Sequence, residues 1–71
     1  MADSVYKVIE LVGTSSDGFE QAVSAAVAQA STSLRDLRIA EVTQLDVTID
    51  NGQVSAYRAK VNVSFKYEGG A

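Results

Sequence analysis

Two long segments in the second half of the chain, residues 37–49 and 54–67, alternate in hydropathy and flank the tripeptide Asp50-Asn51-Gly52. Asn-Gly between such segments is the strongest short signal for a β-hairpin, because both central residues of its turn need a positive φ. Successive side chains of a strand point to opposite faces, so odd-numbered residues share a face. We therefore predict two antiparallel strands whose inward faces carry Leu37, Ile39, Glu41, Thr43, Leu45, Val47 and Ile49, and Ser55, Tyr57, Ala59, Val61, Val63, Phe65 and Tyr67.

A shorter strand is predicted near the start of the chain, over residues 5–12. It is rich in β-branched and apolar residues on both faces, which is typical of a strand inside a sheet or at an interface. The cluster Gly13-Thr14-Ser15-Ser16 that follows has the composition of a turn and predicts the end of this strand.

The residues between these strands have helical periodicity. Asp17 and Glu20 have the spacing of a capping box, and both carboxylates suit the positive end of a helix dipole. One apolar stripe then recurs at helical spacing; it consists of Phe19, Ala22, Val23, Ala26, Val27, Ala30 and Leu34. The predicted order is β-α-β-β, and the predicted fold class is α+β, with a three-stranded antiparallel sheet wrapped on one helix.

Composition restricts how so small a domain is stabilised. The 71 residues include no Cys and no His, which excludes disulfides and thiolate or imidazole metal sites. A chain of this length buries only about 60% of its surface, so we expect association with other copies. A net charge of −3 argues against a nucleic-acid partner. No signal peptide or bilayer-spanning run is apparent, so we expect a cytoplasmic protein without a membrane partner.

The sequence resembles the dodecin family along nearly its whole length. The resemblance rests on residues 5–15, 20–22, 34–42 and 50–52, and on Val61, Val63 and Phe65. It implies a single dodecin-like domain over residues 1–71, a hollow homododecamer, and flavins stacked in pairs near two-fold axes. It also implies ligand storage rather than enzymatic activity. The lack of His and Cys, and of a base near any Ser, agrees with a non-enzyme.

The residues that would carry flavin binding are changed. The usual motif has a tryptophan that stacks on the flavin where this chain has Ile39, in Ile39-Ala40-Glu41-Val42, and a glutamine where it has Arg58. Ile39, Ala40, Gln44 and Arg58 are our candidate ligand-binding residues, and FMN or riboflavin is the expected ligand, with an affinity that these changes reduce or abolish. The competing interpretations are a core or interface role for Ile39 and a solvated or interface-paired Arg58.

Acidic residues support an alternative function. Glu41 lies on the predicted inward face and needs a partner there, such as Arg38, Arg58 or a cation. Asp46 lies on the other face of the same strand, with Asp50 and Gln44. Carboxylates suit calcium, and some dodecin-like proteins that lack the tryptophan are described as calcium-binding. Glu41 and Asp46 are therefore candidate metal ligands at subunit interfaces, against the simpler interpretations of an ion pair and a solvated face.

Overall fold

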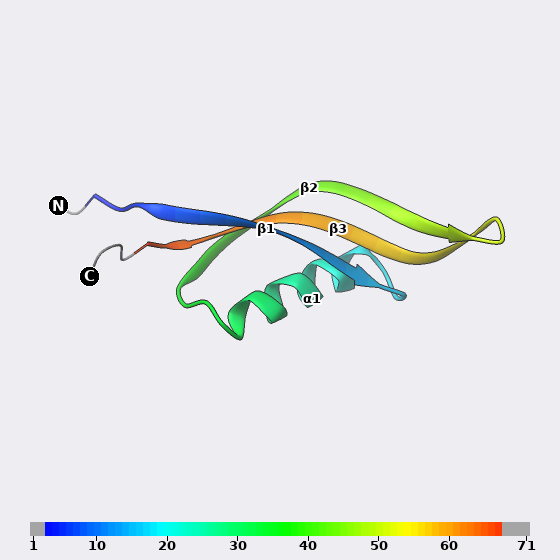
Figure 1. Ribbon diagram of the computed structural model, residues 1–71, viewed down its shortest axis with the longest axis horizontal. Coiled ribbons are helices and arrows are strands. Elements are labelled where there is room, and N and C mark those ends of the chain that lie inside the picture. The colour runs from blue at the N-terminus through cyan, green and yellow to red at the C-terminus, as the bar shows by residue number, and fades with distance from the viewer. Residues whose placement is uncertain (1–2, 68–71) are drawn as a thin grey trace.

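The computed structural model describes residues 3–67. Strand β1 (Tyr6–Ser15) leads into helix α1 (Phe19–Ser31), which is followed by strands β2 (Leu37–Asp50) and β3 (Gln53–Lys66). The strands form one antiparallel sheet in the order β1-β3-β2, and α1 lies across one of its faces (Figure 1). The predicted α+β fold, with three antiparallel strands on one helix, is confirmed.

The hairpin that joins β2 to β3 forms as predicted. Asn51 and Gly52 have φ of 53° and 74°, and Asp50 pairs with Gln53 on either side of them. Two positive φ values in succession define the turn that matches the twist of the two strands. The hairpin extends along the long axis of the molecule beyond the helix (Figure 1).

The core lies between α1 and the odd-numbered face of β3. Ala59, Val61 and Val63 of β3 are buried, in agreement with the predicted inward face. They pack against Ala22 and Ala26 of α1, with Ile9, Leu11, Val23 and Leu37 packed around this cluster. The small side chains of the helix allow it to lie close to the sheet.

The first strand is longer and differently placed than the sequence suggested. It continues through Gly13, Thr14 and Ser15, which pair with Ala59, Arg58 and Tyr57, so the prediction of a turn there is wrong. Gly13 is buried under the helix, where a Cβ would collide with the carbonyl oxygen of Ala22. Helix packing, not a turn, accounts for this glycine. β1 is also an edge strand, so of its two predicted positions, inside a sheet or at an interface, the first does not hold within one chain.

The predicted capping box is also wrong. The residue before the first turn of α1 is Gly18, which makes no side-chain capping hydrogen bond. Asp17 instead donates its backbone N–H to the Oγ of Ser15, 3.0 Å away, because the chain is still turning out of β1 at that point. The apolar stripe was correct in its buried members Ala22, Ala26 and Ala30, although the helix ends at Ser31, before Leu34.

Strand β2 does not keep a strict two-residue period. Its pairing with β3 shifts between Leu37 and Ile39, between Val42 and Gln44, and between Thr48 and Ile49. A bulge inserts an extra residue and so reverses which parity faces the core. The first shift places Ile39 and Glu41 on the face away from α1, and the second returns Leu45 and Val47 to the helix side.

Candidate functional site

We define the outer face as the face of the sheet opposite α1. It carries the even-numbered residues of β1 and β3 and, because of the bulges, a mixed set from β2. Its central residues are Ile39, Glu41, Gln44 and Asp46 of β2, Arg58, Lys60, Asn62 and Ser64 of β3, and Val8, Glu10 and Val12 of β1. Five of the six candidate residues, all except Ala40, therefore lie on this one surface.

Ile39 faces outward, opposite Ser64, and is 65% exposed. The prediction that it shares the inward face with Leu37, Leu45 and Val47 is wrong, because the bulge at the start of β2 turns it over. The apolar side chain is thus on the open face of the sheet, and the competing interpretation of Ile39 as a core residue of the single chain does not hold.

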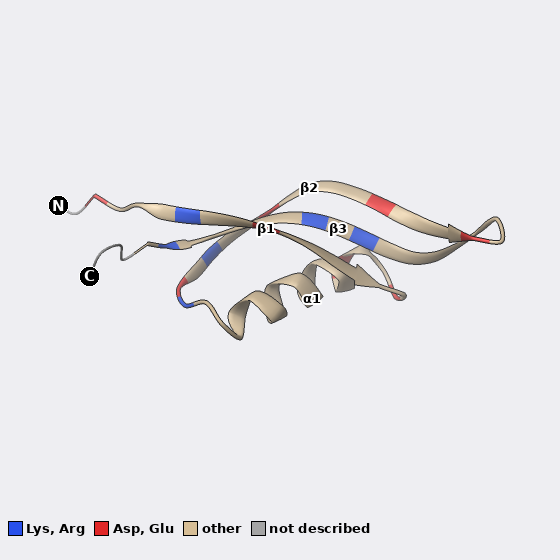
Figure 2. Cartoon of the chain, in the orientation of Figure 1, with Lys and Arg blue, Asp and Glu red and all other residues tan. Residues whose placement is uncertain are grey.

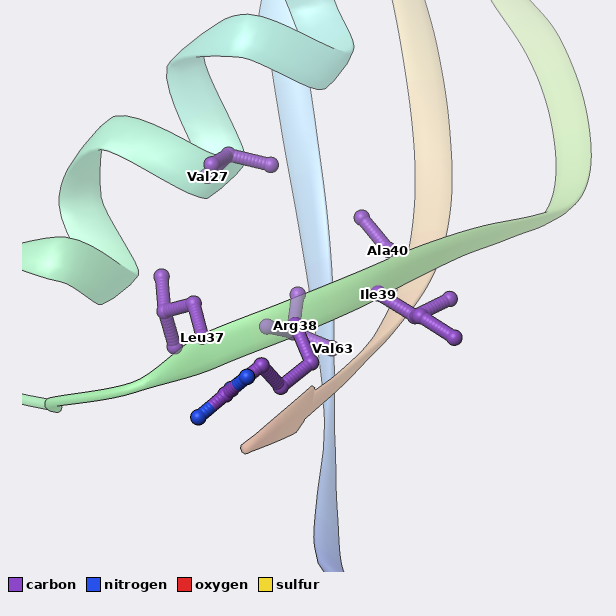
Figure 3. A pocket seen from close by; sticks show the side chains of 6 residues that line it. All are labelled: Val27, Leu37, Arg38, Ile39, Ala40 and Val63. Atoms are coloured by element: carbon purple, nitrogen blue, oxygen red, sulfur yellow. The ribbon is translucent and has the colours of Figure 1, made fainter. Parts of the chain in front are cut away.

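Ala40 points to the other side of the strand. It lines a hollow of about 230 Å³ between α1 and the start of β2, together with Val27, Leu37, Arg38, Ile39 and Val63. Figure 3 shows Val27, Leu37 and Ala40 around this space, with Ile39 directed away from the helix. The side chains of Ala40 and Ile39 therefore point to opposite faces of the sheet, although both residues border the hollow. The sequence did not predict that Arg38 lines this hollow, because its position depends on the bulge between Leu37 and Ile39.

Arg58 and Asp46 form an ion pair on the outer face. Arg58 Nε donates to Asp46 Oδ1 at 2.8 Å, and Arg58 Nη2 donates to Asp46 Oδ2 at 3.4 Å. Gln44 Nε2 donates to the same Oδ2 at 3.4 Å. Three of the candidate residues are thereby joined in one hydrogen-bonded group, although two of them were assigned to a flavin and the third to a cation.

The ion pair shifts the pKa of both Asp46 and Arg58. The hydrogen bond from Arg58, with the positive charge of that guanidinium, holds the pKa of Asp46 below its ordinary value of 3.8, while partial burial opposes this. The same hydrogen bond raises the pKa of Arg58. Both groups are therefore charged at neutral pH.

A second ion pair lies beside the first. Lys60 Nζ is 3.8 Å from Glu10 Oε2, which joins β3 to β1 on the same face. Figure 2 shows two neighbouring basic bands on β3 and an acidic band on the adjacent part of β2. Arg58 and Lys60 each face an acid on a flanking strand, so these two ion pairs together carry no net charge.

Glu41 occupies the outer face as well, so its predicted place on the inward face is wrong. It pairs with Asn62, whose other neighbour across the sheet is Glu10. Strands lie about 4.8 Å apart, which puts the backbones of the two glutamates about 10 Å apart with an amide between them. Within residues 3–67, no three His, Cys, Asp or Glu residues gather closely enough to hold a metal ion.

A single chain does not bring Ile39 and Arg58 together. Ile39 pairs with Ser64 and Arg58 pairs with Asp46, so the two positions are separated by six residues along β3. At about 3.3 Å per residue this is roughly 20 Å. A small ring that touches both residues would have to lie between two chains.

The fold and this surface define a small α+β protein in which one helix covers one face of a three-stranded sheet and the second face stays open. The family model described as Dodecin matches residues 5–68, and the chain belongs to the dodecin family. Within residues 3–67, no helix is both long and apolar enough to cross a bilayer.

Relatives with different names are nearly equally similar to this chain. It is 46% identical over 63 residues to calcium dodecin of Mycobacterium tuberculosis, covering 89% of each chain, and 44% identical over 64 residues to dodecin of Thermus thermophilus, covering 90% and 93%. The structure of dodecin from Streptomyces coelicolor superposes with a TM-score of 0.90 at 44% identity, over 96% of this chain and 97% of that one. A structure of the M. tuberculosis calcium dodecin, described as having a novel calcium-binding site, gives 0.83 at 43% identity, over 96% and 97%.

Proposed function

We propose that this chain, as one dodecin-like domain over residues 1–71, assembles into a hollow homododecamer that stores a small planar ligand without catalysis. Its partners are other copies of itself and the ligand, with neither nucleic acid nor membrane involved, and its location is the cytoplasm. The observation that carries the ligand proposal is the outward position of Ile39 on a face whose two central bases, Arg58 and Lys60, are already paired with acids.

The amount of exposed apolar surface supports self-assembly. Among residues 3–67, the fully buried hydrophobic residues are only alanines and valines. Large apolar side chains remain exposed on every strand; they include Val8 and Val12 of β1, Ile39 and Leu45 of β2, and Val54 of β3. A domain this small gains stability when such side chains are covered by further copies.

The ligand that we propose is a flavin, either FMN or riboflavin, which binds weakly where two copies of the chain meet. Ile39 supplies apolar area to a ring but has no aromatic plane to stack on it, and stacking contributes about 1–3 kcal/mol per contact. Ile39 and Arg58 lie too far apart in one chain to contact one ring, which supports a site shared by two copies.

A fluorescence titration of riboflavin and FMN with the purified protein tests this proposal. We expect saturable quenching with a dissociation constant well above that of a dodecin with the tryptophan, roughly 5- to 150-fold for each lost stacking contact. Quenching should be unchanged by a calcium chelator. No quenching by either flavin, at protein concentrations up to the millimolar range, would overturn the flavin proposal.

Calcium binding is the second candidate function, favoured by the arrangement of Glu10, Asn62 and Glu41. These three residues lie side by side across the outer face and offer carboxylate and amide oxygens, which calcium prefers. The set is too small for the six to eight ligands that calcium takes, so a second copy would have to add donors. A relative at 46% identity carries the name calcium dodecin.

Melting curves with calcium and with a chelator test the alternative. If calcium binds this row, the melting temperature rises with calcium in the wild type and the rise is lost in Glu41→Gln. Glu20→Gln is the matched control, since Glu20 is an exposed glutamate on the helix, away from the outer face. Equal melting curves for the wild type with and without calcium would rule the alternative out.

A further inference from the structure

We propose, building on the proposed flavin-type ligand, that Asp46 is a positioning residue that makes the outer-face site selective for an uncharged planar ring. Asp46 binds the guanidinium of Arg58, so Arg58 recognises carbonyl acceptors on a ring edge and not a negative charge. The ligand class that follows is a neutral heterocycle with carbonyl oxygens, in preference to the same ring carrying a phosphate.

The geometry of the pair fixes the direction of Arg58. Its Nε and Nη2 both donate to the carboxylate of Asp46, so the guanidinium is held in the fork arrangement that suits a carboxylate. Gln44 donates to the same carboxylate, at the oxygen that also accepts from Nη2. Side chains of Arg58 and Asp46 remain 43% and 38% exposed, which leaves the group accessible to a ligand.

The N–H groups of Arg58 that do not bind Asp46 determine what the site can bind. A guanidinium has five N–H groups, and two of them are used by Asp46. Among residues 3–67, no hydrogen bond occupies the other three, two of which belong to Nη1. These can donate to carbonyl oxygens on the edge of a heterocycle, as a neutral amide donor would.

The charges around Arg58 cancel. On its own row across the sheet it is flanked by Thr14 and Asp46, and the next base on its face, Lys60, is paired with Glu10. A phosphate brought to this surface therefore meets no net positive charge. Removal of Asp46 leaves the guanidinium unpaired, and its attraction for an anion then becomes effective.

The test compares dissociation constants of riboflavin and FMN, which share a ring and differ by a phosphate. The wild type should bind riboflavin more tightly than FMN. In Asp46→Asn the preference for FMN over riboflavin should rise by about 3- to 10-fold at low salt, and the gain should shrink at high salt. Asp46→Glu should restore the wild-type ratio, since it restores the carboxylate.

Asp50→Asn is the matched control. It removes the same charge from the same strand, at the hairpin, where Asp50 pairs with Gln53 and not with Arg58. In Asp50→Asn the ratio of the riboflavin and FMN dissociation constants should stay at the wild-type value. Arg58→Gln, a second variant, leaves Asp46 unpaired and should shift the preference the other way, toward riboflavin.

The outcomes separate the two proposals. If both flavins bind and Asp46→Asn and Asp50→Asn give the same ratio as the wild type, the role of Asp46 is overturned while ligand binding stands. If the wild type and Asp46→Asn bind neither flavin, the proposed function fails and the selectivity fails with it. A shift in Asp46→Asn alone, reversed in Arg58→Gln, supports the inference.

Discussion

Ile39 stands where the resemblance to dodecins led us to expect a tryptophan. Its side chain lies on the open face of the sheet, so nothing within the described chain prevents a larger side chain there. Ala40, its neighbour, faces the helix. A larger side chain there would enter the hollow beside Val27 and Leu37 and would not reach the open face.

The exposed position of Ile39 leads to a direct prediction. Ile39→Trp should strengthen flavin binding by about 1–3 kcal/mol, or roughly 5- to 150-fold, because it supplies a plane for stacking. The chain has no Trp of its own, so quenching of the new indole fluorescence reports binding. Ile49→Trp, at a similarly exposed apolar position near the hairpin, is the control and should leave the affinity unchanged.

Asp46 gives a second prediction, in the pH dependence of stability. Its pKa in the folded chain lies below its unfolded value near 3.8, so the ion pair with Arg58 stabilises the fold above that pH and stops doing so as the pH falls through the folded pKa. Thermal melts of the wild type and Asp46→Asn should differ at pH 7 and converge in acid, once the pH has fallen below the folded pKa of Asp46. A difference that persists unchanged in acid would show that the loss has another cause.

The candidate site could be predicted from the sequence only in part. Gln44, Asp46 and Arg58 were identified as candidates, but their hydrogen bonding to one another depends on register. Simple alternation placed Ile39 and Glu41 on the wrong face, because nothing in the local sequence announces a bulge next to Arg38 or Thr43. The row of Glu10, Asn62 and Glu41 was missed for the same reason, since its members meet only across strands.

At the scale of elements, the closest contact between β1 and α1 is at Gly13, a residue of the strand that the sequence placed in a turn. Gly13 lies within β1 directly under the helix, in a space that the backbone of Ala22 closes. Two further alanines, Ala26 and Ala30, continue this close approach along the helix.

Gly13→Ala should therefore destabilise the fold, by about 1–3 kcal/mol, because backbone must move to admit one methyl group. Urea denaturation at equal chain concentrations measures the change. Gly18→Ala is the control: its backbone is extended, and a Cβ there meets only the end of the Gln21 side chain. We expect that variant to stay within about 0.5 kcal/mol of the wild type. Equal losses in both variants would contradict the proposed role of the contact at Gly13.

Element types were predictable because their signals are local. Asn51-Gly52 specifies its own turn, and the alanines of α1 reveal its buried side through their spacing. The ends of the helix and strands were not predictable, because they depend on contacts between segments that are distant in the sequence. Gly13-Thr14-Ser15 has a turn-like composition, yet pairing with β3 and packing against Ala22 keep it in the strand.

At the scale of the whole molecule, the described chain is long and thin, with extents of 54 × 20 × 17 Å. A single helix covers part of one sheet face, and the other face, with Val8, Val12 and Ile39 exposed, has no covering element in residues 3–67. Such a shape leaves much apolar surface in water, so we expect both the stability of the fold and the proposed ligand site to depend on the proposed assembly.

The most direct test is a light-scattering mass across a size-exclusion peak, with riboflavin absorbance recorded on the same peak. Twelve chains of 7.5 kDa predict about 90 kDa. We expect that mass, with riboflavin eluting on the peak only when it is also present in the running buffer, as suits a weak site between copies. A mass near 7.5 kDa, or a flavin absorbance that follows single chains, would contradict both the assembly and a site that two copies share.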